Sequence, residues 1–522
     1  MRRFLCVVIT VICAFVFFSF LSYKNLHHEG EITIFFDRDM DSSSLIMSDV
    51  KSKIAHLGYK VYALHFDPVE IEHFLITNPS ALYVTDKDLH TNLFQLQKHK
   101  YTSVRVAVTS HNSDLHSISS DELRGAGATA DLQTGSLADI DMLKKLMRHR
   151  IPYGVISFQD LSLQVKTLSV DGIFPSLENI RNGTYRHVLH ATIYFRKDAT
   201  VMKNPELERQ LGSWQKEAFS IIAGGDIMLS RGVKPYLQKF GVHYPFDDIR
   251  TVIQPHDIAF ANLESPISNR GRMFHPFKGI YFRTDPSVVE GLHACGFDVL
   301  SLANNHALDW GIDAIVDTMS HLEKSGIQYS GIGFSRKEAL VPAVFTVSGA
   351  RVAFLCYNDI YPLFYTESGR TVRTLSLKLG ELKQEIDALK QIYDVIVVSV
   401  HTGTEYLLEP EKEKIKKMRA LVDAGAQVVL GSHPHVVQGI ELYRGGLIAY
   451  SLGNLIFDQN WSTETSLGLL LEIGFLRKRP IYYKPSVVSI ERSRAHIVDD
   501  VDAASVFSYI HRKKDVSEYV KN

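Results

Sequence analysis

The sequence predicts an α/β protein, because short apolar, β-branched runs alternate with segments of helical periodicity along most of its 522 residues. Five of these runs, each expected to be a buried strand, are followed directly by acids, histidines or amides. The five runs are residues 219–223, 258–261, 299–303, 395–400 and 427–430. Open α/β sheets hold ligands at the carboxyl ends of their strands, so these polar groups are expected to meet at one site.

The polar residues after the five runs have the chemistry of metal ligands. They are Gly225-Asp226, Asn262-Leu263-Glu264, Asn304-Asn305-His306, His401-Thr402-Gly403-Thr404-Glu405 and Gly431-Ser432-His433-Pro434-His435. A single histidine after a strand is usually a packed or surface residue, but five clusters in one domain favour a metal centre. Imidazole nitrogen and carboxylate oxygen together suit Zn, Mn or Fe. The absence of a nearby cysteine argues against a structural thiolate zinc site.

Six longer segments carry a resemblance to a known family. They are GDIMLSRG (225–232), ANLESPIS (261–268), SLANNHALDWG (301–311), HTGTEY (401–406), GSHPHVVQG (431–439) and YSLGNLIFD (450–458). In this order they resemble the bacterial capsule-synthesis proteins of the CapA or poly-γ-glutamate type, whose domain is similar to calcineurin-like metallophosphoesterases. The resemblance implies a four-layer αββα sandwich over residues 213–522.

The resemblance also implies a set of metal ligands and catalytic residues. Two divalent ions, Mn, Zn or Fe, would be held a few ångströms apart, where they activate a water and neutralise developing charge. The implied ligands are Asp226 and His435 for one ion, Asn305, His401 and His433 for the other, and Glu264 between them. His306 and Glu405 are the implied catalytic residues, for proton transfer. Met228 stands where many calcineurin-like enzymes have a histidine ligand, so occupancy by one ion stays open.

Two functions follow from this interpretation. The first is a metal-dependent hydrolase of capsule or poly-γ-glutamate biosynthesis, which cuts a phosphoester, amide or ester bond in a cell-envelope polymer. The alternative is a non-catalytic assembly or export factor that uses the same fold. An intact ligand set favours chemistry, because buried unpaired charge is costly to retain in a binding module. The expected partners are the polymer or a phosphoester substrate and the capsule synthesis machinery in the membrane.

Residues 24–212 are expected to form an α/β domain of their own, ending in the polar segment 198–215. Its predicted strands are residues 32–36, 60–65, 81–84 and 104–108, and its predicted helices include residues 48–57 and 91–99. Residues 105–197 resemble the second half of phosphate-type periplasmic solute-binding proteins. The Ser-Gly-Thr loop with which that family holds its anion at a helix N-terminus is not found, so a degenerate domain is expected and a phosphate sensor is disfavoured.

Residues 1–23 are expected to contain a transmembrane anchor. Residues 4–23 carry no charge and are long enough, as a helix, to cross a hydrocarbon core of about 30 Å. Arg2 and Arg3 precede them, which predicts a single-pass protein with a cytoplasmic N-terminus and an extracytoplasmic body. A cleaved signal peptide is the alternative, but no small-x-small cleavage site precedes Lys24.

Composition excludes other classes of function. The chain has 57 basic and 58 acidic residues and no basic stripe interleaved with aromatic side chains, so nucleic acid is not an expected partner. Of its four cysteines, only Cys295 and Cys356 lie beyond the expected anchor, and both are expected to be buried free thiols. Two residues keep two interpretations each: Asp309 as a helix N-cap or a site residue, and Asn454 as a turn or a site residue.

Overall fold

The computed structural model describes residues 214–498 except 274–277, residues 166–186, a few single positions, and the backbone of six strands nearer the N-terminus. The chain divides into two compact units, which are described separately. The first contains residues 1–107, 120–160 and 186–214, and the second contains residues 108–119, 161–185 and 215–522. Residues 161–185 therefore group with the second unit, although the sequence suggested one continuous N-terminal domain. The expected anchor at residues 4–23 lies outside the described residues, and none of the described helices is long and apolar enough to span a bilayer.

The N-terminal sheet has the strand order β2-β1-β3-β9-β4-β6, with β7 paired to β4. Its strands are β1 (Glu31–Asp37), β2 (Lys60–Phe66), β3 (Ala81–Thr85), β4 (Leu96–Thr109), β6 (Gly154–Ser157), β7 (Lys166–Thr167) and β9 (Val188–Arg196). The four predicted strands of this region are confirmed. The predicted helix at residues 91–99 is wrong from Leu96 onward, because this segment pairs antiparallel with β9 along its whole length. Cross-strand pairing here overrides the local helical pattern.

The first sheet of the second unit has the order β13-β12-β11-β10-β24-β25-β26, with β23 also paired to β10. Its strands are β10 (Ala218–Ile227), β11 (Ile258–Leu263), β12 (Val299–Ser301), β13 (Gln328–Ser330), β23 (Asn454–Ile456), β24 (Leu467–Leu476), β25 (Arg479–Glu491) and β26 (Arg494–Ile497). Strands β10 to β13 and β23 run parallel, and β24 to β26 continue the sheet antiparallel. The parallel part aligns the carboxyl ends of β10, β11 and β12 at one edge.

The second sheet has the order β15-β16-β19-β20-β22-β21. Its strands are β15 (Ala343–Val347), β16 (Ala350–Asn358), β19 (Val395–His401), β20 (Val428–Ser432), β21 (Ile440–Tyr443) and β22 (Gly446–Ala449). Strands β16, β19, β20 and β22 run parallel. All five strands that the sequence placed before polar clusters are therefore present, in two sheets.

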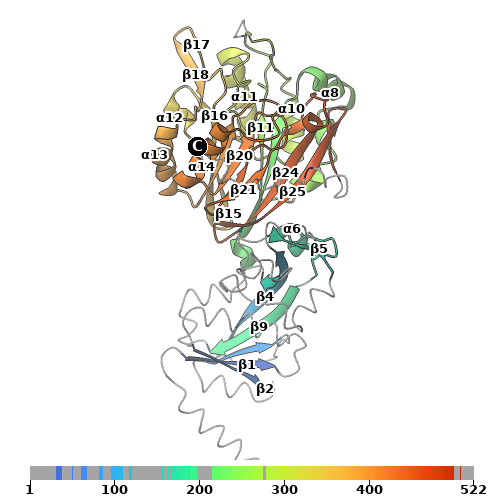
Figure 1. Ribbon diagram of the computed structural model, residues 1–522, viewed down its shortest axis with the longest axis vertical. Coiled ribbons are helices and arrows are strands. Elements are labelled where there is room, and N and C mark those ends of the chain that lie inside the picture. Colours follow the sequence, from blue (N-terminus) through green and yellow to red (C-terminus); the bar gives the residue numbers. More distant parts are fainter. Residues whose placement is uncertain are drawn as a thin grey trace, which may run out of the picture. The chain divides into compact units, whose positions relative to one another are not determined.

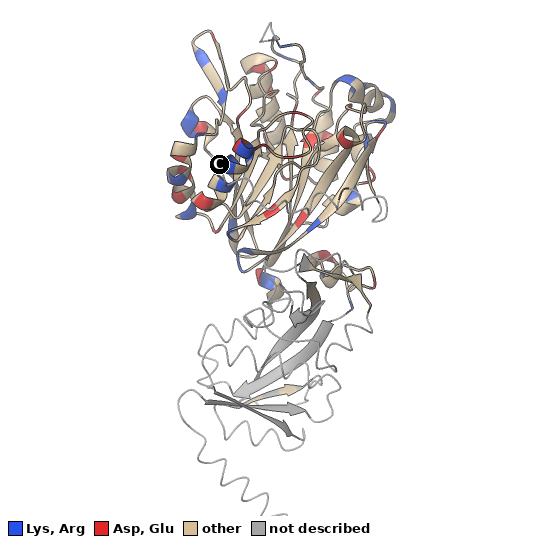
Figure 2. Cartoon of the chain, in the orientation of Figure 1, with Lys and Arg blue, Asp and Glu red and all other residues tan. Residues whose placement is uncertain are grey.

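Three apolar cores order these layers. One core joins inward-facing residues of the two sheets, such as Phe260 on β11 and Phe354 on β16, whose rings stack at 5.8 Å. A second core lies between the first sheet and helices α10 (Val288–Cys295) and α11 (Gly311–Lys324). A third lies between the second sheet and helices α13 (Leu379–Lys390) and α14 (Lys412–Ala424). The unit is thus built as helices, sheet, sheet and helices (Figure 1), and many of the charged residues lie on the helices (Figure 2).

Shorter elements complete the second unit. They are β5 (Ser117–Ile118), β8 (Ser169–Val170), α6 (Leu177–Arg181), α8 (Lys234–Phe240), α9 (Arg250–Ile253), β14 (Ile332–Gly333), α12 (Arg336–Ala339), β17 (Phe364–Glu367) and β18 (Arg370–Thr374). Short 3-10 helices cover Trp214–Glu217, Arg231–Val233, Tyr244–Phe246 and Glu464–Ser466. Cys295 and Cys356 are both buried and free, as predicted, and burial raises the pKa of each thiol to about 12.

Candidate metal centre

The polar clusters of the two sheets meet where their strands end. In the first sheet Asp226 of β10 is in register with Asn262 of β11, and in the second sheet His401 of β19 is in register with Ser432 of β20. The amide of Asn262 reaches from one sheet to the other, because its Nδ2 donates to Asp226 Oδ1 at 2.8 Å and lies 3.4 Å from His401 Nδ1. The parallel strands of both sheets therefore deliver their terminal side chains to one buried place.

Glu264 lies at the middle of this place. Its Oε1 is 3.8 Å from His401 Nε2, 3.8 Å from His435 Nε2 and 4.0 Å from His306 Nε2. The side chain is fully buried, and neither carboxylate oxygen has a hydrogen-bond partner among the described residues. Burial and the neighbouring Asp226 raise the pKa of Glu264 well above its usual value. A buried carboxylate without a donor is costly, so this position calls for a cation.

Asp226 is held from three sides. Its Oδ1 accepts from Asn262, its Oδ2 accepts from the His433 backbone N–H at 3.2 Å, and the same Oδ2 lies 3.4 Å from His435 Nδ1. The residue two positions later is Met228, whose sulfur accepts from the backbone N–H and hydroxyl of Ser230 at 3.1 and 3.0 Å. The Met228 sulfur therefore accepts hydrogen bonds from its sequence neighbour Ser230.

His401 and Asn305 face each other across the site. His401 Nε2 lies 2.9 Å from Asn305 Oδ1, and His401 Nδ1 lies 2.9 Å from Ser432 Oγ. Burial, together with the charges of His433 and His435, lowers the pKa of His401 well below its usual value. A neutral imidazole is the form that binds a metal, so this environment suits a ligand.

His433 and His435 both have left-handed backbones, with φ of 96° and 58°, on either side of Pro434. Non-glycine residues seldom adopt this region, and such strain persists where the surrounding structure enforces it, often at functional sites. His433 Nδ1 is buried without a hydrogen-bond partner among the described residues. His435 Nδ1 lies 3.0 Å from Asn454 Oδ1, which leaves its Nε2 directed toward Glu264.

The donor set fits divalent metal. Two groups of three residues, Glu264 with His433 and His435, and Asp226 with Glu264 and His401, each place their ligand atoms within 4.8 Å of one another. All five residues are buried. Mixed imidazole and carboxylate donors suit Zn, Mn or Fe. The unpartnered oxygens of Glu264 and the unpartnered Nδ1 of His433 are the observations that an ion between them would explain.

His306 approaches the centre from the first sheet as part of a buried trio. Its Nδ1 lies 2.7 Å from Asp309 Oδ2, and Lys278 Nζ bonds Asp309 Oδ1 at 2.5 Å and the Asn305 carbonyl at 2.7 Å. The Phe282 ring stacks on the His306 ring at 3.8 Å. Burial lowers the pKa of His306 to about 4. With Nδ1 tied to Asp309, the Nε2 of His306 is the nitrogen that faces Glu264.

The N-cap interpretation of Asp309 is wrong. Helix α11 begins at Gly311, and its N-cap residue is Trp310, which makes no side-chain cap. Asp309 instead uses one oxygen for Lys278 and the other for His306 and the Phe282 backbone N–H, at 2.7 Å. A buried carboxylate so fully used for a site histidine belongs to the centre.

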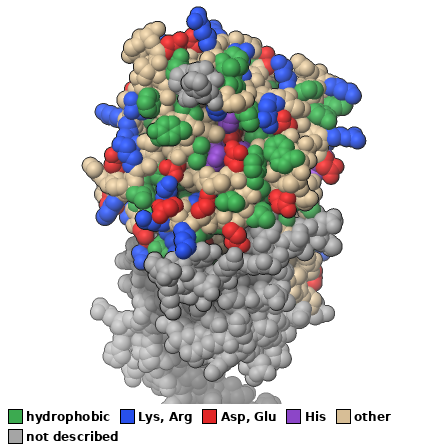
Figure 3. Space-filling view, turned by 45° about the horizontal axis from the view of Figure 1, so that its top comes forward, with side chains coloured by type: hydrophobic (Ala, Val, Ile, Leu, Met, Phe, Trp, Pro, Cys, Tyr) green, Lys and Arg blue, Asp and Glu red, His purple; other side chains and the backbone are tan. Residues whose placement is uncertain are grey.

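Glu405 lies apart from the buried groups, on the exposed rim. Its charge still acts on the centre, since it is among the causes that raise the pKa of Glu264 and His435. Next to it Tyr406, 44% exposed, lies with its ring 6.2 Å from that of His435 and 5.8 Å from that of Trp461, which is 60% exposed. Figure 3 shows histidine and acidic side chains within a hollow of this face, with hydrophobic side chains around it.

Asn262, Asn304 and Lys278 contribute to the centre without a site role assigned from the sequence alone, and Asn454, left open between a turn and a site residue, contributes as well. Asn262 and Asn304 bond each other at 3.1 Å, Asn454 fixes His435, and Lys278 bonds Asp309. Asn262, Asn304 and Asn454 lie inside motifs already singled out. The sequence signal that could have identified them was an amide side chain in the same motif as, or next to, a predicted site residue. Lys278 lies in a segment without a strand pattern, so its position depends on tertiary structure.

Comparisons with known proteins agree with the motifs. Residues 220–459 match the family described as bacterial capsule synthesis protein PGA_cap. The chain is 31% identical over 278 residues to "Capsule biosynthesis protein CapA" of Bacillus anthracis, covering 52% of this chain and 68% of that protein. It is 32% identical over 247 residues to "PGA biosynthesis protein CapA" of Bacillus subtilis, covering 47% of this chain and 65% of that protein.

Solved structures are matched more distantly. A 5'-nucleotidase precursor from Thermus thermophilus is 18% identical, with a TM-score of 0.33, covering 56% of this chain and 58% of that one. A phosphate transport receptor from Vibrio cholerae is 14% identical, with a TM-score of 0.20, covering 40% of this chain and 98% of that one. TM-scores this low carry no argument about fold or function. By its sequence relatives, the chain belongs to the bacterial capsule synthesis protein family, PGA_cap.

Proposed function

We propose that this protein is a divalent-metal-dependent hydrolase of capsule or poly-γ-glutamate biosynthesis. The observation that carries the proposal is the buried carboxylate of Glu264, which has no hydrogen-bond donor among the described residues and lies 3.8 Å from two imidazole nitrogens. A structural core would not retain such a group unpaired. In this proposal Asp226, Glu264, Asn305, His401, His433 and His435 would hold the metal, with Glu264 belonging to both groups of neighbouring donors. When bound, divalent ions polarise a substrate oxygen and lower the pKa of a water.

The chain's own groups have defined tasks in this proposal. Asn262 orients Asp226, and Asn454 orients His435, so the carboxylate and the imidazole are fixed before any ion binds. His306 presents Nε2 toward the centre, because Asp309 holds its Nδ1. That nitrogen can exchange a proton with a substrate oxygen or nitrogen at the scissile bond. Glu405, on the exposed rim, is the second proposed proton-transfer residue.

The proposed substrate is a capsule polymer, with an amide, ester or phosphoester as the scissile bond. Two relatives, 31% and 32% identical, are named for capsule and PGA biosynthesis. Exposed Tyr406 lies beside His435, and exposed Trp461 lies beside Tyr406, so the two rings supply a wide contact surface at the rim, which suits an extended chain better than a small molecule. We further propose that residues 4–23 anchor the protein in the cell membrane, with the body extracytoplasmic beside the capsule synthesis machinery.

The test is a comparison of full-length protein with its His401→Ala variant, using His243→Ala as a matched control. His243 pairs with Glu290 on a half-exposed surface away from the centre. Hydrolysis is measured on a nitrophenyl phosphodiester and on γ-glutamyl oligomers, with Mn²⁺, Zn²⁺ or Fe²⁺ added. We expect turnover that requires metal, is lost in His401→Ala and persists in His243→Ala.

Two results would change the conclusion. Equal turnover by the parent and His401→Ala would remove this centre from the reaction. Metal bound by the parent, no hydrolysis of any probe and normal polymer output in cells carrying His401→Ala would favour the assembly-factor alternative.

A further inference from the structure

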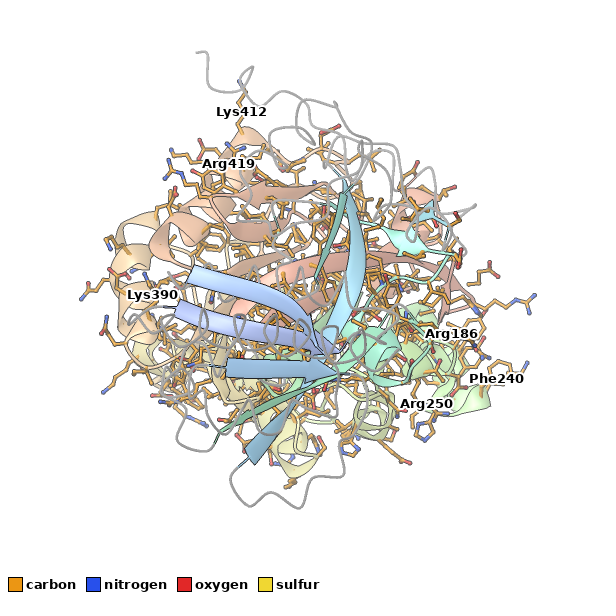
Figure 4. All side chains as sticks on the ribbon, turned by 90° about the horizontal axis from the view of Figure 1, so that it is seen from below. Arg186, Phe240, Arg250, Lys390, Lys412 and Arg419 are labelled. Carbon is orange, nitrogen blue, oxygen red and sulfur yellow. The ribbon has the colours of Figure 1, made fainter. Side chains whose placement is uncertain are left out.

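Helix α14 carries a lysine where its amphipathic pattern calls for an apolar residue. Its buried face includes Lys414, Met418, Leu421 and Val422, and Lys414 is only 2% exposed. By contrast, the side chains of Lys412 and Arg419 extend from the outside of the helix (Figure 4). Lysine is almost never fully buried unless it is paired, so this position requires an explanation.

The Lys414 amine has no hydrogen-bond partner among the described residues. It lies under Gly403 in the loop that follows His401: a Cβ at Gly403 would be 3.1 Å from Lys414 Nζ and Cδ and 3.4 Å from Glu411 Oε2. Gly403 itself has φ of 109°, so a residue with a side chain is excluded there by backbone and by space. The amine is therefore confined beside the loop that delivers His401 to the centre.

The charge of Lys414 interacts with the charges of residues at the centre. The groups whose charges interact with that of Lys414 are Glu411 at the start of its own helix, Asp226 on β10, and His401 and His433 at the ends of β19 and β20. Burial lowers the pKa of Lys414 to about 7, and Glu411 and Asp226 oppose that change. Beyond the burial that dominates, its charge also lowers the pKa of His401 and His433.

We propose that Lys414 is a positioning residue that limits the affinity of the centre for divalent metal, through the repulsion between its buried ammonium and the bound ion. In the metal-free protein the same ammonium partly balances the buried carboxylate of Asp226. Repulsion between charges inside a protein is only weakly screened. One internal cation therefore changes the affinity of the centre for a divalent ion measurably. This inference rests on the proposed metal centre and adds a determinant of its occupancy.

The test measures Mn²⁺ binding by isothermal titration calorimetry in full-length protein stripped with chelator. We compare wild type with Lys414→Met and Lys414→Gln, which remove the charge, and with Lys416→Met, which removes the same charge from an exposed position of the same helix. At pH 6 we expect Lys414→Met and Lys414→Gln to bind Mn²⁺ about tenfold more tightly than wild type. Lys416→Met should stay within about twofold of wild type, because an exposed charge is screened.

The pH dependence supplies a second readout that a structural role would not change. The wild-type amine is protonated below its pKa of about 7 and neutral above it. The affinity advantage of Lys414→Met should therefore be present at pH 6 and fall toward parity at pH 8, since proton competition at the ligands is common to both proteins. Lys414→Arg keeps its charge at both pH values and should bind more weakly than wild type at pH 8.

The outcomes separate this inference from the proposed function. If wild type binds no Mn²⁺ at either pH, the metal centre itself is refuted, and the role of Lys414 with it. If wild type binds Mn²⁺ but Lys414→Met and Lys414→Gln bind with unchanged or lower affinity at pH 6, only the inference about Lys414 is overturned. Equal tightening by Lys416→Met would show a general charge effect and would overturn it as well.

Discussion

At the scale of single residues, the centre is defined by groups whose protonation is set by burial and by each other. Burial and Asp226 raise the pKa of Glu264, so its charged form is disfavoured in the metal-free protein. Burial alone would lower the pKa of His435, but Glu264 and Asp226 together raise it to about 9. These two residues therefore form a proton-binding pair in the absence of metal, and the proposed ion would take the place of the protons.

This pair predicts how stability depends on pH. The folded state holds protons on Glu264 and His435 that the unfolded chain releases at lower pH, so their contribution is lost as pH rises through the folded pKa of His435. Lys414, whose pKa is lowered to about 7, contributes in the opposite direction over this range, so the test uses the Lys414→Met variant, whose melting temperature after chelator treatment should fall between pH 7 and pH 9. Saturating Mn²⁺ should abolish this decline, because the ion replaces the protons. A melting temperature that rises over this range without metal would contradict the assignment.

A second prediction concerns the trio of His306, Asp309 and Lys278. Asp309→Asn removes the charge that balances the largely buried Lys278 amine and leaves one acceptor oxygen in place of the two that bond Lys278 and His306. Breaking such a pair costs roughly 3 kcal/mol of unfolding free energy, whereas removing both charges costs less. Urea denaturation should therefore show Asp309→Asn to be less stable than the double variant Asp309→Asn with Lys278→Met. If the double variant is the less stable of the two, the amine does not depend on Asp309.

At the scale of elements, the strand that carries Asp226 is held by a close approach of two backbones. A Cβ at Gly225 would lie 2.0 Å from the Gly453 carbonyl oxygen, and the Asp226 N–H donates to that same oxygen at 2.9 Å. Glycine at position 225 thus allows β10 to pass the segment that leads into β23 and Asn454. The geometry of two site residues depends on this one contact.

Gly225→Ala should therefore destabilise the protein and weaken metal binding together. The added methyl group forces the two backbones apart, which costs on the order of 1–3 kcal/mol and displaces Asp226 from Asn454. Gly380→Ala is the matched control: Gly380 lies in α13 with nothing within 4 Å of its added Cβ, so this change should raise stability by about 0.5–1 kcal/mol. Equal effects of the two substitutions in thermal melts would contradict this interpretation of the contact.

Helices illustrate what the sequence could predict and what it could not. The sequence predicts helices over residues 378–392 and 411–424, because their charged and apolar positions repeat with helical spacing, and α13 and α14 agree with these ranges within two residues at each end. The N-cap interpretation of Asp309 failed, since Asp309 has the chemistry of an N-cap but its carboxylate is used by His306. From Leu96 onward the sequence has a helical pattern, but the segment forms a strand because it pairs with β9. In both cases a partner distant from the local pattern decided the outcome.

At the scale of the whole molecule, the sequence predicted the second unit well because its strands end in motifs. Asp226, Glu264, Asn305, His401, His433 and His435 come from five strand ends, since both His433 and His435 follow β20, and the structure brings all six together in a buried cluster. The supporting residues were harder to predict, because Lys278 and Asn454 act through contacts that no local pattern encodes. The expected anchor and the ligand-binding capacity of residues 24–212 remain predictions, to be tested by membrane fractionation and by phosphate titration.

The central claim is that this cluster binds divalent metal. The measurement that tests it most directly is titration of chelator-stripped, full-length protein with Mn²⁺ and Zn²⁺ by calorimetry, with Glu264→Gln as the comparison. Glutamine keeps the shape of the side chain but removes the charge that lies between His401 and His435. We predict saturable binding by wild type and a loss of affinity of at least about tenfold in Glu264→Gln. No saturable binding by wild type, or equal binding by both proteins, would contradict the account.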